Sequence, residues 1–128
     1  IRERLSEIAI QPFILQLRGV GYFPERGGPP RVLWVGLHKT PPQLFQLQHK
    51  VENALFRLGF DPGKRSYTPH VTVGRIGNVA QGTLAHYLKR HKTFETAPFR
   101  VNGYTLYESI GERGRRIHAP LESLPLAI

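Results

Sequence analysis

The chain has 128 residues, 40% of them hydrophobic, and it carries 18 Lys and Arg side chains against nine acidic ones, a formal net charge of +9. This length and composition fit one globular domain with a real core and exclude an intrinsically disordered chain. The absence of cysteine excludes disulfides, thiol catalysis and thiolate metal sites, and it fits a reducing compartment such as the cytoplasm. The basic charge favours a polyanionic partner such as nucleic acid, with a basic surface kept for solubility as the alternative.

The ends of the sequence and its apolar runs also set expectations. The chain contains no methionine and begins Ile1-Arg2-Glu3-Arg4, so we expect it to be part of a longer translation product. No apolar run approaches the roughly 20 residues of a membrane-spanning helix, so no membrane partner is expected.

Five segments are predicted in the first half of the chain from apolar spacing and from glycine and proline positions. They are a helix over residues 1–9, a strand over 13–17, a loop-rich connection from Gly19 to Pro30, a buried strand over 32–37 and an amphipathic helix over 43–58. Thr40, Pro41 and Pro42 mark the start of that second helix, and Gly59 is its expected C-terminal cap.

The second half of the chain predicts further strands and one helix. They are a strand over 71–76, a helix over 79–91 capped by Asn78, strands over 99–101 and 104–109, and a closing strand over 117–121. The basic residues from Lys89 to Lys92 fit the negative end of the predicted helix, with a phosphate contact as the alternative. This order predicts an α+β fold with a largely antiparallel sheet and helices packed outside it, as a single domain over residues 1–128.

The stretch from Tyr67 to Ile76 carries the chemistry. Pro69 biases Thr68 to an extended backbone, and the alternation that follows places His70 and Thr72 on one face of a strand. An imidazole titrates near neutral pH, and a hydroxyl can donate to an anionic oxygen. Arg75 follows closely, but strict alternation places it on the opposite face unless Gly74 bends the strand.

Two other patterns compete with this site. His38-Lys39-Thr40 is a second His-x-Thr triplet, but it precedes a helix-start signal rather than opening an apolar strand. The stretch from Gly59 to Ser66 is superficially like a phosphate-binding loop, yet its glycine spacing is too short and Arg65 follows Lys64 where Ser or Thr is required. Lys64 and Arg65 are therefore expected only to hold positive charge next to His70.

The residues from Thr68 to Arg75 resemble the second signature of the 2H phosphoesterase superfamily. Within it, the sequence is most similar to the RNA 2′,3′-cyclic phosphodiesterases, also called 2′-5′ RNA ligases. The resemblance extends along nearly the whole chain, through the strand at Phe13, the turn from Gly19 to Phe23, the strand and helix over 32–59, Leu58-Gly59-Phe60, and Leu106-Tyr107-Glu108-Ser109. It implies a bilobal fold in which two His-x-Thr/Ser signatures face each other across a cleft.

The resemblance also implies roles for individual residues. His70 would accept a proton in hydrolysis, Thr72 would bind a non-bridging phosphate oxygen, and Arg75 and Tyr67 would assist substrate binding. No cofactor is implied, and one histidine without a nearby carboxylate is a poor metal ligand set. His118 stands where family members often have an aromatic residue. The resemblance therefore assigns no role to His118 in that part of the substrate wall.

Three functions remain open at this point. The first is hydrolysis of RNA or nucleotide 2′,3′-cyclic phosphate ends to 2′-phosphomonoesters, with reverse 2′-5′ ligation. In that case the chain is expected to lack the first strand, first helix and first signature of the family, and the complete protein is expected to be a monomer. The second is a non-catalytic basic RNA-binding module, and the third is a stable structural remnant of the enzyme.

Overall fold

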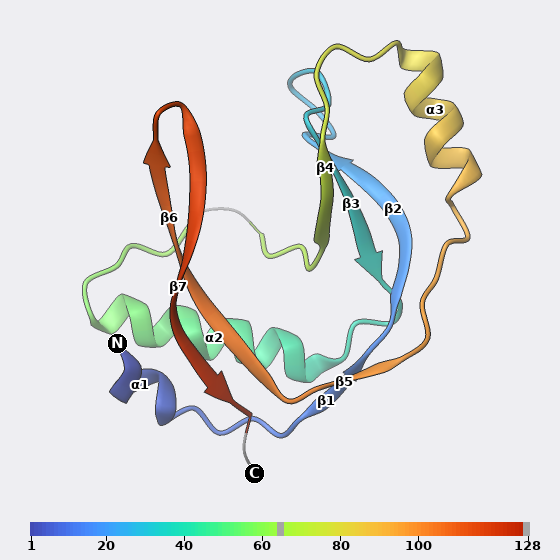
Figure 1. The fold of residues 1–128 in the computed structure, drawn as a ribbon. Coiled ribbons are helices and arrows are strands. Elements are labelled where there is room, and N and C mark those ends of the chain that lie inside the picture. The colour runs from blue at the N-terminus through green and yellow to red at the C-terminus, as the bar shows by residue number, and fades with distance from the viewer. Residues whose placement is uncertain (64–65, 127–128) are drawn as a thin grey trace. The chain divides into compact units, whose positions relative to one another are not determined.

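The computed structural model describes residues 1–63 and 66–126, leaving aside the Glu112 side chain, and the fold class is the predicted α+β (Figure 1). The elements are α1 (Arg2–Ser6), β1 (Phe13–Leu15), β2 (Leu17–Phe23), β3 (Val32–Leu37), α2 (Pro42–Arg57), β4 (Val71–Arg75), α3 (Gln81–Arg90), β5 (Phe99–Val101), β6 (Gly103–Glu112) and β7 (Arg115–Pro125). They form two compact units, one of Ile1–Ile14, Pro41–Lys64 and Arg100–Ile128, the other of Leu15–Thr40 and Arg65–Phe99.

The second unit is built on an antiparallel sheet of order β2-β3-β4. The register places Gly21 opposite Trp34, and the indole of Trp34 lies across the glycine: a Cβ at Gly21 would stand 2.2 Å from Trp34 Cζ2. No other residue type fits at position 21 without moving the indole. The α3 helix lies beside β2 (Figure 1), with Leu84 buried.

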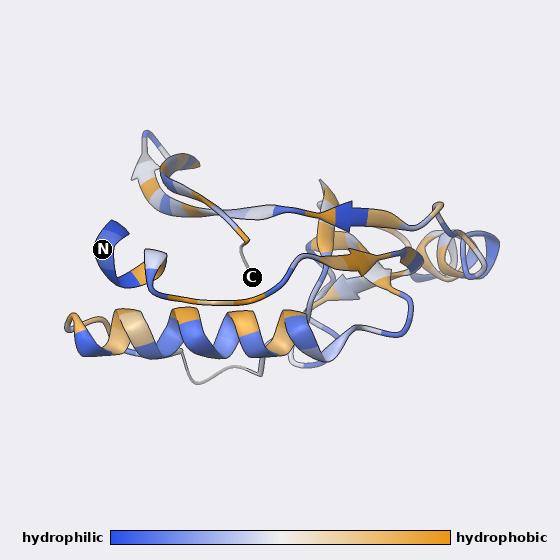
Figure 2. Cartoon of the chain, turned by 90° about the horizontal axis from the view of Figure 1, so that it is seen from below, coloured by the Kyte–Doolittle hydropathy of each residue, from blue (hydrophilic) through white to orange (hydrophobic). Residues whose placement is uncertain are grey.

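The first unit holds α1, α2 and the β6–β7 hairpin. Pro42 occupies the first turn of α2, Gly59 follows its end with φ +97°, and hydrophobic and hydrophilic residues alternate around the helix (Figure 2). The residues buried here share an apolar character and come from α1, α2, the segment around β1 and the end of β7: Leu5, Ile10, Phe13, Leu47, Leu124 and Leu126.

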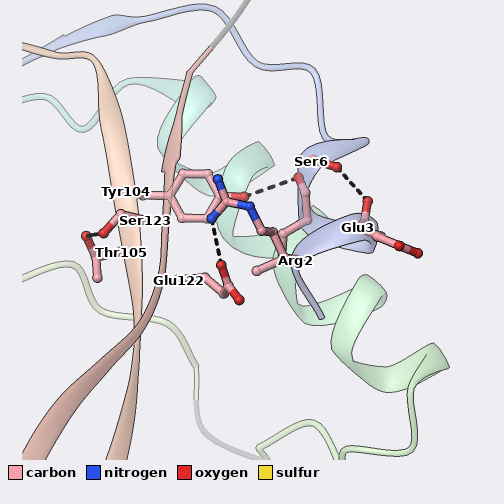
Figure 3. Close-up of polar contacts among 8 residues, drawn as sticks. Arg2, Glu3, Ser6, Tyr104, Thr105, Glu122 and Ser123 are labelled. Carbon is pink, nitrogen blue, oxygen red and sulfur yellow. Dashed lines mark hydrogen bonds and ion pairs between the residues drawn. The ribbon is translucent and has the colours of Figure 1, made fainter.

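Polar contacts tie α1 to the hairpin within the first unit. Arg2 Nη1 donates to Glu122 Oε2 at 2.8 Å, and the Tyr104 hydroxyl donates to the Leu5 carbonyl at 3.4 Å (Figure 3). A two-residue turn joins β6 to β7, and both its residues, Arg113 and Gly114, have positive φ, which matches the twist of paired strands.

Three of the predicted boundaries are wrong for identifiable reasons. The segment predicted as a loop from Gly19 continues as strand β2 to Phe23, because pairing with β3 outweighs the local loop tendency of Gly19 and Gly21. The helix α3 starts after Ala80 without a side-chain cap, so Asn78 does not cap it. The closing strand runs to Pro125 rather than Leu121, because the β6–β7 register continues past a bulge between Leu106 and Tyr107.

Candidate active site

His70 lies immediately before β4, at the edge of the three-stranded sheet, and is exposed to solvent. Its Nδ1 is 2.6 Å from the Thr68 carbonyl oxygen. A carbonyl can only accept, so Nδ1 carries the proton and donates it to this bond. In the neutral ring Nε2 is then unprotonated and able to accept a proton.

Two aromatic rings, one from β2 and one from β3, contact the imidazole. The Phe23 ring meets His70 edge-on with centroids 5.0 Å apart, and the Trp34 indole lies 6.3 Å away, centroid to centroid. Phe23 and Trp34 also contact each other, at 5.4 Å. Sequence reasoning did not find these two residues as site neighbours. Trp34 is the single tryptophan of the chain, but the pairing of three strands is needed to bring it to His70.

Thr72 and Arg75 lie on the same face of the sheet. Thr72 stands opposite Trp34, whose ring contacts His70, so the hydroxyl and the imidazole share that face. The register then shifts, with Gly74 opposite Leu33 and Arg75 opposite Val32. Val73 is the extra residue of this bulge, and alternation resumes one position later. Val32 shares the face of Trp34, so Arg75 does too.

The remaining candidates have different surroundings. Tyr67 is 42% exposed, and burial raises the pKa of its hydroxyl above the ordinary 10.0. His38 Nδ1 lies 3.3 Å from the Arg18 guanidinium, which can only donate, so it acts as an acceptor there. His118 is exposed on β7 opposite Ser109, in the first unit. Lys64 and Arg65 lie outside the described residues.

The described ranges contain neither a cluster of metal-ligating side chains nor a membrane-spanning helix. Within residues 1–63 and 66–126, no three His, Asp or Glu side chains come together as a metal site. The helices of the same ranges include none with the length and apolar character needed to cross a membrane.

Comparison with known proteins gives a consistent set of relatives. The family model for LigT like phosphoesterases matches residues 35–118. The RNA 2′,3′-cyclic phosphodiesterase of Aeropyrum pernix is 34% identical over 128 residues, which cover 99% of this chain and 72% of that protein. The protein of the same name from Archaeoglobus fulgidus is 36% identical over 110 residues, covering 86% of this chain and 60% of the relative.

A solved structure agrees with the sequence relatives. Apo E. coli LigT superposes with a TM-score of 0.70 at 25% sequence identity, and the match covers 99% of this chain and 66% of that one. The chain thus spans between 60% and 72% of the length of these relatives. The predicted family is confirmed: this chain belongs to the LigT-like phosphoesterases, a family of 2H phosphoesterase enzymes.

Proposed function

We propose that the protein containing this chain hydrolyses RNA or nucleotide 2′,3′-cyclic phosphate ends to 2′-phosphomonoesters. The observation that carries the proposal is the 2.6 Å bond from His70 Nδ1 to the Thr68 carbonyl, which leaves Nε2 of this exposed histidine as the base. The curated relatives of the chain are RNA 2′,3′-cyclic phosphodiesterases, which supports the same substrate class.

The proposed reaction needs a base and an acid on opposite sides of the phosphorus. His70 Nε2 takes a proton from water as the water oxygen attacks, and the bond from phosphorus to O3′ breaks. A second histidine, from a His-x-Thr/Ser signature outside these 128 residues, gives its proton to O3′. A 5′-hydroxyl in place of water would form a 2′-5′ linkage by the same proton transfers, which is the reverse ligation.

Thr72 and Arg75 would bind the charge that develops on the phosphoryl oxygens. Both share the face of His70, and an arginine can hold a phosphate through two parallel hydrogen bonds. Tyr67 would add a neutral hydroxyl donor, because its raised pKa keeps the phenol protonated through the working pH range. We place the complete protein in the reducing cytoplasm, as a monomer.

The test is hydrolysis of a nucleoside 2′,3′-cyclic phosphate by the full-length gene product and by the 128-residue chain, each with and without His70→Ala. We expect turnover by the long form and a loss of roughly 10²–10⁴-fold on substitution, the usual contribution of a general base. His38→Ala, in the other His-x-Thr triplet, is the matched control and should retain full activity.

No turnover by the unsubstituted long form would refute the hydrolase. The net charge of +9 favours a second candidate in that case, a non-catalytic RNA-binding module. That module would bind RNA in a salt-dependent way, and the binding would survive His70→Ala.

A further inference from the structure

A cavity lies in the same unit as His70, between β2 and the C-terminal end of α3. It has a volume of about 720 Å³, within the range of roughly 300–1,000 Å³ typical of small-ligand pockets. Gly21 and Trp34 form part of its wall, and the side chains of Arg26, Lys89 and Lys92 line it together with one carboxylate, Glu25. We refer to it as the Trp34 pocket.

Trp34 connects this pocket to the candidate active site. Its ring system lies 6.3 Å from His70 by centroids, and it also lies across Gly21 at the pocket wall. Trp34 thus contacts His70 and also lines the pocket, so an RNA strand that occupied both sites would cross the indole. The indole fills the place of a side chain at Gly21, whereas Gly19 presents backbone without a side chain to the pocket.

The basic side chains that line the Trp34 pocket outnumber its acidic side chain. Among the residues that the structure describes, Arg26, Lys89 and Lys92 form no ion pair. Glu25 is the one acidic side chain in the lining, so three cations face one carboxylate. Such an excess of positive charge beside an aromatic ring is the combination that single-stranded nucleic acids bind, with phosphates on the cations and bases on the ring.

We propose that the Trp34 pocket binds the nucleotide preceding the cyclic end of an RNA strand, with Lys89 and Lys92 contacting its phosphate. This inference rests on the proposed function, because it takes His70 as the position of the cyclic phosphate. It identifies the preferred substrate as an oligonucleotide rather than a mononucleotide. Lys89 and Lys92 are binding residues in this scheme and do not take part in the proton transfers.

The competing explanation is that these lysines only complement the negative end of the α3 dipole. Arg90 separates the two explanations, because it lies in the last turn of α3 beside Lys89 but does not line the pocket. A dipole or general charge effect would be shared by all three residues. Binding in the pocket would involve Lys89 and Lys92 alone.

The experiment compares two substrates of the full-length protein, a nucleoside 2′,3′-cyclic phosphate and a short single-stranded RNA with the same cyclic end. The RNA should have the lower KM. Lys89→Ala and Lys92→Ala should each raise its KM roughly threefold, and the double variant about tenfold, in line with exposed ion pairs. The KM for the mononucleotide, kcat for both substrates, and all constants of Arg90→Ala should stay unchanged.

Direct binding gives a second readout that does not need turnover. A 3′-phosphorylated oligonucleotide should bind more tightly than the corresponding mononucleotide. Its logarithmic salt slope should fall by roughly 0.7 for each lysine removed, the value for one phosphate on a single strand. If neither cyclic substrate is hydrolysed but this binding difference is present, the proposed function fails while the pocket stands. Equal effects of Arg90→Ala and Lys89→Ala, or equal KM values for the two substrates, would overturn the pocket.

Discussion

At the scale of single residues, the backbone carbonyl of Thr68 decides which nitrogen of His70 can act as a base. The bond occupies Nδ1 and fixes the tautomer, so the reactive nitrogen is set by main-chain geometry rather than by a charged partner. The edge-on Phe23 ring restricts the plane of the imidazole. Together these contacts orient an exposed histidine that would otherwise sample several rotamers.

Thr72 offers a test of the oxygen-binding role. Because Thr72 is exposed on β4, Thr72→Ala should leave the thermal unfolding temperature nearly unchanged. We expect kcat/KM for the cyclic phosphate to fall by roughly 10- to 100-fold, the cost of one or two lost kilocalories of hydrogen bonding to a charged group. Thr72→Ser keeps the hydroxyl and should retain most of the activity; an equally inactive serine variant would contradict the role.

The ionisation of two tyrosines should lower the free energy of unfolding at alkaline pH. Burial raises the pKa of both Tyr67 and Tyr104 above 10.0, so the folded state holds these protons to higher pH than the unfolded state does. Their contribution is complete below pH 10 and decreases as the pH rises beyond it. Urea unfolding between pH 8 and 11 should show this decrease, and Tyr104→Phe should make it shallower. An unchanged slope in that variant would show that other groups set the limit.

At the scale of elements, the packing of β3 against β2 in the second unit depends on the Trp34 side chain, which lies across Gly21. The indole occupies the space above Gly21, so the large side chain on β3 fits only because its partner on β2 has no side chain. This pairing explains why a strand can contain the sequence Gly19-Val20-Gly21. It also keeps Trp34 close to both His70 and the pocket beside α3.

Gly21→Ala should therefore destabilise the protein. The new methyl group would stand 2.2 Å from Trp34 Cζ2, and overpacking of this kind costs about 1–3 kcal/mol. Gly82→Ala in α3 is the matched control, since its Cβ would meet nothing within 4 Å. It should change stability by less than about 1 kcal/mol, in the stabilising direction. Chemical denaturation of both variants measures the difference, and similar losses in the two would rule out the clash.

At the scale of the whole molecule, the buried apolar side chains are unevenly divided. Of the eight hydrophobic residues that are buried within residues 1–63 and 66–126, six belong to the first unit, whereas Val35 and Leu84 belong to the second unit. On β4, Val71 is 45% exposed and Val73 is 54% exposed. The unit with the candidate site thus has the smaller core.

Leu5 tests the core of the first unit, because it is 1% exposed in a helix of five residues. Leu5→Ala should lower the free energy of unfolding by about 2–5 kcal/mol, through lost burial and the cavity left behind. Leu58, at the end of α2, is 40% exposed, and Leu58→Ala should have a much smaller effect. Urea unfolding of the two variants decides whether the short helix is part of the core.

The sequence patterns predicted the family, the fold class and the elements whose signals are local. The strand over 32–37 and the helix ending before Gly59 are examples, because apolar spacing and capping residues lie within each segment. Non-local features could not be predicted in this way. The strand through Gly19 and Gly21 depends on Trp34 from the next strand, and the neighbours of His70 depend on the register of three strands. The roles of His70, Thr72, Arg75 and Tyr67 remain predictions.

The bulge at Val73 has a genetic consequence. Deleting that single codon would remove only the extra residue, and strict alternation over Thr72, Gly74 and Arg75 would still place the Arg75 guanidinium on the face of Thr72 and His70. The arrangement of side chains at the site is thus compatible with two strand lengths, one with the bulge and one without it. Loss of Val73 should therefore change the chemistry of the site less than a missense change at Thr72 or Arg75.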